Sequence, residues 1–166
     1  MTFVRSFAAA ACAAALLGGC AGHGYGPSGV AVGQTEGDVA RSMGAPTGRY
    51  ALPGGGTRLE YARGPYGRQT FMIDLDPTGR VAGWQQVLTE ANFLRVTPGM
   101  SRQDLLLLLG RPGEVFAVPW QNGEVWNWRY ATNDCLWFQA TVLRTGEVKD
   151  AGHGIDPRCA GPADRW

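Results

Sequence analysis

The pattern of polar and apolar positions marks two short segments, 36–43 and 102–109, as α-helices. Each is preceded by a hydroxyl residue with an aspartate three positions later, a spacing that caps the free N–H groups of a first helical turn. Each is followed by a glycine, which adopts the left-handed conformation of a helix end without strain, and then by a proline, which cannot continue the helix. These paired signals are Thr35 and Ser101, Asp38 and Asp104, Gly44 and Gly110, and Pro46 and Pro112. Helices of two turns are not stable alone, so we expect both to pack on a sheet.

Alternation of apolar and polar residues after each helix predicts three antiparallel strands. In the second half, Trp126, Trp128 and Tyr130 fall on one face of such a strand. The predicted strands are 57–62, 69–75 and 80–88 in the first half and 125–130, 135–143 and 147–152 in the second. The sequence therefore predicts an α+β fold in which each half is a short helix followed by a three-stranded antiparallel meander.

The two halves are expected to be tandem copies of one unit. The helix signals lie 66 residues apart, and the strands and turns match at offsets of 67 to 69. Matched positions are Gly79 with Gly146, Val81 with Val148, Leu59 with Trp128, and Tyr61 with Tyr130. One unit of about 60 residues is marginal alone, whereas two can share a core. We expect units over 32–88 and 96–152, with the all-apolar second helix more buried than the first.

Several motifs of this pattern are those of a known domain family. They are G-M-S-R-Q-D-L over 99–105, L-G-R-P over 109–112, W-N-W-R-Y over 126–130, and the turns over 76–81 and 144–148. The chain resembles the SmpA/OmlA lipoprotein domain, the BamE-like family of small subunits of the outer-membrane β-barrel assembly machinery. The resemblance implies a scaffolding role for the protein. It also implies that the matched residues are needed for the fold rather than for an activity. The tandem pair is also similar to the β-lactamase-inhibitor protein, a secreted binder with two related repeats.

The first twenty residues predict a lipoprotein signal. Arg5 precedes an apolar run over 7–17, and Leu17-Gly18-Gly19-Cys20 resembles the bacterial lipobox. A transmembrane helix needs about 20 apolar residues, so the run is too short to span a membrane. The remaining alternative is an ordinary signal peptide with an accidental Cys20. The resemblance implies a signal peptide over 1–19 and acylation of Cys20, with palmitate among its acyl chains.

The residues after the lipobox bear on the location of the protein. No aspartate follows Cys20, whereas an aspartate at that position tends to retain lipoproteins of enteric bacteria in the inner membrane. We therefore expect a lipid anchor in the outer membrane, with the folded part on the periplasmic face. Residues 20–31 are glycine-rich and are interpreted as the lipidated cysteine and a flexible tether.

Two cysteines remain after the signal and the lipid anchor are assigned. Cys135 and Cys159 form an even pair in an oxidising compartment, which predicts a structural disulfide that holds the C-terminal tail over 153–166. Such a bond typically contributes about 2–4 kcal/mol. A redox or metal pair is the alternative, but the spacing is not that of a C-x-x-C motif and no histidine cluster accompanies it.

Charge and composition indicate no nucleic-acid partner and no enzyme. The chain has 15 basic and 14 acidic residues, without a basic patch. The two histidines, His23 and His153, are far apart in the sequence, which disfavours Cys/His nucleophilic chemistry. Asp74 and Asp76 are interpreted as solvated turn residues. We therefore expect no catalytic residues, no metal and no cofactor.

The tryptophan and tyrosine stripe is interpreted first as core. The alternative is that Trp84, Trp120 or Trp137 is exposed and anchors a protein partner. The resulting expectation is a lipid-anchored, non-catalytic envelope protein that contributes to outer-membrane β-barrel protein assembly or envelope integrity. Its expected partners are the membrane, through the N-terminal lipid, and a protein of the cell envelope such as a subunit of the assembly machinery. The alternative function is a lipid-anchored inhibitor or binding module for a periplasmic enzyme.

Overall fold

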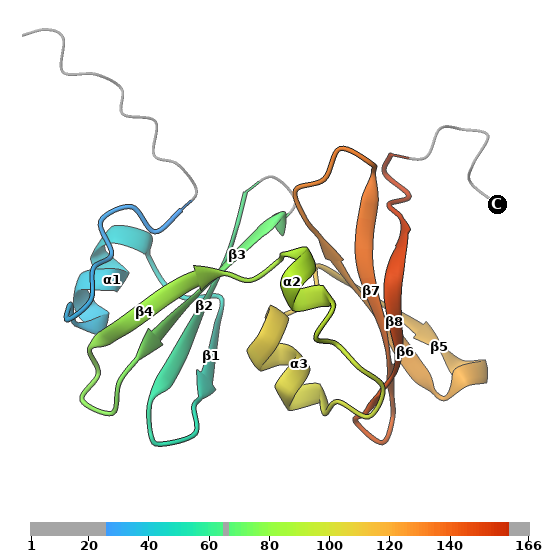
Figure 1. Ribbon diagram of the computed structural model, residues 1–166, viewed down its shortest axis with the longest axis horizontal. Coiled ribbons are helices and arrows are strands. Elements are labelled where there is room, and N and C mark those ends of the chain that lie inside the picture. The colour runs from blue at the N-terminus through green and yellow to red at the C-terminus, as the bar shows by residue number, and fades with distance from the viewer. Residues whose placement is uncertain (1–25, 65–66, 160–166) are drawn as a thin grey trace, which may run out of the picture.

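Two four-stranded antiparallel sheets and a few short helices form the described part of the chain, residues 26–64 and 67–159 of the computed structural model (Figure 1). The fold is therefore α+β. The elements of the first half are α1 (Glu36–Met43), β1 (Gly48–Ala51), β2 (Thr57–Arg63), β3 (Gln69–Leu75) and β4 (Val81–Gln86). A short helix α2 (Glu90–Phe93) follows, and then α3 (Arg102–Leu109), β5 (Glu114–Val118), η2 (Pro119–Gln121), β6 (Gly123–Arg129), β7 (Leu136–Leu143) and β8 (Val148–Ile155).

Both predicted helices are confirmed, and their starting signals act as expected. The Thr35 hydroxyl accepts a hydrogen bond from the Asp38 N–H, and the Asp38 carboxylate accepts one from the Thr35 N–H at 2.9 Å, which completes a capping box. Ser101 accepts from the Asp104 N–H at 3.0 Å. These bonds satisfy free N–H groups of the first turn, so both helix starts are set locally.

The stop glycines have positive φ, as predicted, but not the left-handed helical conformation. Gly44 has φ 78° and ψ −165°, and Gly110 has φ 79° and ψ −171°. This region of backbone space is open essentially to glycine alone. The chain therefore leaves each helix in an extended direction and can enter a strand within a few residues.

Each sheet has four strands, so the prediction of three-stranded meanders is wrong by one strand in each half. The missing strands are β1 and β5, which follow the helices and pair antiparallel with β2 and β6. Both are short edge strands, four and five residues long, with no clear alternation of apolar and polar residues. They are held by backbone pairing to a partner strand, a non-local interaction that the local pattern does not show.

The sheet register also corrects the predicted match between the halves. Both sheets have an irregularity near the end of their third strand, at Asp74/Leu75 and at Thr141/Val142, a separation of 67. Phe71 and Phe138 are also 67 residues apart, and they are paired with Tyr61 and Trp128 on the neighbouring strands. Tyr61 therefore corresponds to Trp128. The offset of 69 is therefore wrong by two residues. Tyr61 and Trp128 also make equivalent hydrogen bonds to the glycine that ends the preceding helix. The Tyr61 hydroxyl donates to the Gly44 carbonyl at 3.3 Å, and the Trp128 indole N–H donates to the Gly110 carbonyl at 3.1 Å.

The elements stack in the order α1, first sheet, α3, second sheet (Figure 1). One core cluster joins Val39 of α1 to the first sheet through Leu59, Ile73 and neighbouring residues. The other core cluster includes Leu105 and Leu109 of α3, Trp126, Trp128 and Phe138 of the second sheet, and Met72 of the first sheet. The expectation that the second helix is the more buried is confirmed, since α3 lies between the two sheets.

A buried glutamate fixes the junction between the halves. Glu60 is 1% exposed and lies on the face of the first sheet that is turned toward α3. Its carboxyl group accepts hydrogen bonds from the Tyr50 hydroxyl, from the Thr47 hydroxyl at 3.0 Å and from the Arg111 N–H just beyond α3 at 3.1 Å. Arg58 adds a bond of 2.6 Å from its guanidinium to the Leu107 carbonyl. The first sheet therefore binds the C-terminal end of α3 by hydrogen bonds as well as by apolar contact.

Candidate interaction surface

The three tryptophans proposed as partner anchors have different environments. Trp120 is 81% exposed and Trp84 is 49% exposed, whereas Trp137 is 4% exposed. The interpretation of Trp137 as an exposed anchor is therefore wrong. The Arg129 guanidinium lies 5.1 Å from the centre of its ring, and Phe116 packs beside it at 6.2 Å between ring centres.

Trp120 lies at the tip of the hairpin made by β5, η2 and β6. Pro119 begins η2, which is one turn of 3₁₀ helix, and its fixed φ suits a first helical position. Asn122 closes the turn in the left-handed conformation, with φ 54°. Gly123 then starts β6, and a side chain there would bring a Cβ within 2.6 Å of the Val142 carbonyl oxygen. The turn is thus defined by its sequence and presents Trp120 to solvent on an ordered support.

The hairpin also exposes apolar residues along β5. Val115 and Phe116 are each 48% exposed, and Ala117 is exposed as well. They lie on both faces of the strand, because Val115 is opposite Trp126 of the core while Phe116 is opposite Val125 on the outer face. The pattern of apolar and polar residues does not predict β5, so it does not indicate these side chains. The signal in the sequence that does point to them is the uninterrupted apolar run Val115-Phe116-Ala117-Val118.

The outer face of the second sheet is turned away from α3 and carries polar side chains that form hydrogen bonds with one another. Arg129 is 6% exposed and forms a bidentate pair with Asp156, at 2.6 and 2.9 Å, and a third bond of 2.6 Å to Glu114. Gln139 donates to the Asn127 side chain at 2.7 Å. These bonds satisfy the polar side chains of this face within the second sheet and the segment that follows β8.

Ion pairing at this face shifts two pKa values. Hydrogen bonding to Asp156 raises the pKa of Arg129 above its ordinary value, against the opposing effect of burial. Burial favours the neutral form of Asp156, but the hydrogen bonds from Arg129 and from the Arg158 N–H, together with the charges of both arginines, outweigh it and lower the pKa of this carboxyl group. Both groups are therefore held in their charged forms, which suits a structural pair.

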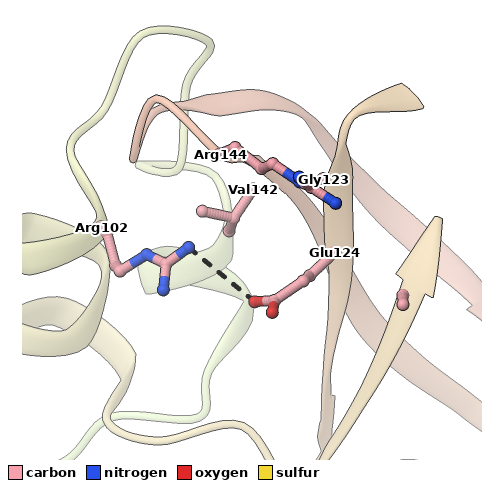
Figure 2. A pocket seen from close by; sticks show the side chains of 6 residues that line it. Arg102, Gly123, Glu124, Val142 and Arg144 are labelled. Carbon is pink, nitrogen blue, oxygen red and sulfur yellow. Dashed lines mark ion pairs between the residues drawn. The ribbon is translucent and has the colours of Figure 1, made fainter. Parts of the chain in front are cut away.

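A small pocket lies between α3 and the second sheet, close to the hairpin (Figure 2). Its volume is about 110 Å³, and its lining residues are Arg102, Ala117, Gly123, Glu124, Val142 and Arg144. Arg102 points across it toward Glu124, with 3.8 Å between their charged atoms, and its guanidinium lies 5.2 Å from the centre of the Trp126 ring. Pockets for cofactors and drug-sized ligands are typically about 300–1,000 Å³, so this one is too small for such a molecule.

The two described cysteines are close together and exposed. Both are free thiols in the structure, and a hydrogen bond between them raises the pKa of Cys159. The chain between β8 and Cys159 is held by bonds from the Asp156 N–H to the Cys135 carbonyl and from the Cys159 N–H to the Asp156 carbonyl. The disulfide stays a prediction, and this geometry is compatible with it.

Some predicted features lie outside the described residues. These are the signal peptide over 1–19, Cys20, His23, and the end of the tail from residue 160. Within residues 26–64 and 67–159, no helix is long and apolar enough to cross a membrane. Within the same ranges, no three His, Cys, Asp or Glu side chains are grouped so that they could hold a metal ion.

Comparison with known proteins gives weak structural likenesses. No protein-family model matches the chain, and no curated protein matches it either. One similar solved structure is a DUF4309 family protein, YjgB, from Bacillus subtilis, with 14% identity and a TM-score of 0.29 over 76% of this chain and 82% of that one. Another is a cysteine-rich secretory protein from Staphylococcus aureus, with 9% identity and a TM-score of 0.30 over 76% of this chain and 44% of that one. Both TM-scores are too low to carry an argument about function.

Proposed function

We propose that the protein is a lipid-anchored, non-catalytic envelope protein that contributes to outer-membrane β-barrel protein assembly or envelope integrity. The observation that carries this proposal is Trp120, which is 81% exposed at the tip of an ordered hairpin. Tryptophan is among the residues most enriched at the energetic centres of protein interfaces, because it buries a large rigid surface at little entropic cost. An exposed tryptophan on a fixed turn is therefore suited to bind a partner.

The proposal includes a tandem origin for the two halves. Both halves have the same order of one helix and four antiparallel strands, and both helix starts pair with the turn before the last strand, Thr35 with Arg80 and Ser101 with Glu147. Together with the paired caps, stop glycines and sheet irregularities, these features support two copies of one unit. The motif resemblance to the SmpA/OmlA domain then suggests a scaffolding role for each copy.

The membrane anchor is assigned to Cys20, from the lipobox and the glycine-rich segment that follows it. Two or more acyl chains on one residue would hold the protein stably, whereas one chain alone binds marginally. We expect Cys20→Ser to abolish palmitate labelling and to block signal maturation. A variant that still matures and stays labelled would refute the anchor.

Co-purification from a mild detergent extract tests the partner class. The wild-type chain should recover subunits of the barrel assembly machinery, and Trp120→Ala should lose them. Trp84→Ala is the matched control, because Trp84 is exposed in the other half of the chain, and it should retain them. Deletion of the protein should raise outer-membrane permeability and lower porin levels.

A second candidate function is inhibition of a periplasmic enzyme, and the same hairpin favours it. A narrow turn with one exposed aromatic residue has a shape that can enter a concave site. Recovery of a soluble periplasmic enzyme by the wild-type chain but not by Trp120→Ala, with unchanged permeability on deletion, would support this alternative. A purified protein that turns over a substrate, and loses that activity on a point substitution, would overturn both functions.

A further inference from the structure

β5 is an edge strand with exposed apolar side chains. It is the outermost strand of the order β5-β6-β7-β8, and Val115, Phe116 and Ala117 are all exposed. No charged residue interrupts the run from Val115 to Val118. An edge of this kind leaves backbone N–H and C=O groups open to pairing with another chain, and proteins ordinarily block such an edge with charges, prolines or bulges.

The other edge strands of the described chain have such protection. β8 carries Lys149 and Asp150, with exposed side chains, next to an irregularity in its pairing. β1 carries Arg49, which is paired with Glu36 of α1. β4 also has a pairing irregularity, and it ends in two glutamines. β5 therefore differs from the other edges in both composition and regularity.

We propose that two copies of this chain pair through β5, antiparallel about a twofold axis at Phe116, so that their second sheets join into one continuous sheet. This register is the one that overlaps all five residues of the strand. It places Phe116 opposite the partner's Phe116, Val115 opposite the partner's Ala117, and Glu114 opposite the partner's Val118. An isologous contact of this kind closes on itself and gives a dimer.

The side chains of β5 fit this pairing in size. Directly opposed residues of antiparallel strands point to the same face of the sheet. On the face turned toward α3, the larger Val115 of each copy meets the smaller Ala117 of the other. Ala117 lines the pocket of Figure 2, so the partner's Val115 lies at the rim of this pocket. On the outer face the two Phe116 rings meet, which covers a side chain that is 48% exposed in one copy.

The charges near β5 are compatible with the same pairing. Glu114 is the one charged residue of the strand, and Arg129 and Arg158 bind its carboxylate at 2.6 and 3.1 Å. The register opposes it to an apolar residue and not to the partner's Glu114. No like charges therefore meet across the twofold axis. The pairing uses residues 114–118 and leaves Trp120 outside it, so this inference and the proposed function can fail separately.

Disulfide trapping tests the register directly. In an antiparallel pair, opposed Cβ atoms are about 4.5–5.5 Å apart, close enough for a disulfide with small adjustments. Phe116→Cys in the full chain, oxidised in neutral detergent, should give covalent dimers on a non-reducing gel. Val115→Cys is the matched control, because Val115 has the same 48% exposure but does not face itself across the axis. Equal trapping of both variants, or trapping of Phe116→Cys no greater than of the wild-type chain, would overturn the register.

The mass of the protein tests the dimer itself. Sedimentation equilibrium in density-matched detergent should give twice the chain mass for the wild type and the single mass for Phe116→Lys, which places a charge on the edge. Leu94→Lys is the control, because Leu94 is 82% exposed and lies outside β5, and it should remain dimeric. A monomeric wild type would overturn the proposal, even if β5 captured a strand of another protein. If Phe116→Lys is unfolded by circular dichroism, the trapping result decides.

Discussion

Replacement of Glu60 tests how the two halves are joined. Glu60→Ala removes the carboxyl group that accepts from Tyr50, Thr47 and Arg111 at the junction between the first sheet and α3. The Thr47 hydroxyl keeps a second acceptor, the Glu60 carbonyl at 3.1 Å. The Tyr50 hydroxyl and the Arg111 N–H lose theirs in a part-buried site. Each buried donor left unsatisfied costs about 1–3 kcal/mol, so the two donors together predict a loss of about 2–6 kcal/mol in the free energy of unfolding.

Glu60→Gln is the matched comparison. The amide oxygen of the glutamine can accept the hydrogen bonds from the Tyr50 hydroxyl and the Arg111 N–H. Its NH₂ group can donate a hydrogen bond to the Thr47 hydroxyl, because a hydroxyl oxygen is an acceptor as well as a donor. We therefore expect a cost of about 1 kcal/mol, the value of one weakened hydrogen bond. Asp150→Ala removes an exposed carboxylate from β8, and surface changes of this kind usually stay within about 0.5 kcal/mol.

Urea unfolding followed by tryptophan fluorescence measures these differences, since Trp128 is 1% exposed and reports on the core next to α3. The expected order of stability is wild type, then Glu60→Gln, then Glu60→Ala. Small domains are stable by about 5–15 kcal/mol, so the alanine variant should remain measurable but clearly shifted. A Glu60→Ala midpoint equal to that of the wild type, or equal to that of Glu60→Gln, would refute the role assigned to this carboxyl group.

Three further predictions follow from the same structure. Gly110→Ala should lower the free energy of unfolding more than Gly44→Ala, although both glycines have positive φ. A Cβ at Gly110 would lie 3.0 Å from the Glu60 carboxylate, whereas a Cβ at Gly44 would meet nothing within 4 Å. Equal unfolding midpoints of the two variants would contradict this. The pKa of Asp156 is lowered in the folded state, so the unfolded chain binds more protons and stability should fall as the pH drops through and below the ordinary value of 3.8. Asp156→Asn should flatten that acid dependence in unfolding curves, and an unchanged slope would refute it. Mass spectrometry of the non-reduced, periplasm-derived protein should recover one peptide pair that contains Cys135 and Cys159, and two freely alkylated thiols would exclude the disulfide.

Helices α1 and α3 could be predicted from the sequence because their limits depend on neighbouring residues, whereas the one-turn helix α2 was not predicted. Hydroxyl caps and glycine stops act within one turn, so they are visible in a window of a few positions. β1 and β5 could not be predicted in the same way. Four or five residues at a sheet edge carry no measurable periodicity, and their position depends on pairing to a strand that follows later in the chain. The same reason explains the offset error, because register is a property of the pair of strands.

The candidate surface was predictable only in part. The Pro119-Trp120-Gln121-Asn122-Gly123 run has the composition of a turn, and turns lie at the surface. Trp137 is buried because Arg129 covers its ring and Phe116 packs beside it, which depends on two other strands. Glu60 has the appearance of a surface strand residue in the sequence. Its role depends on Arg111, which is 51 residues away.

Photo-crosslinking from position 120 in living cells tests the central claim most directly. A benzoylphenylalanine in place of Trp120 should form an adduct with a subunit of the outer-membrane barrel assembly machinery. The same group in place of Leu94, which is 82% exposed, should not form that adduct. Failure of position 120 to react with an assembly subunit, or equal reaction from both positions, would contradict an envelope protein that binds this machinery through its hairpin.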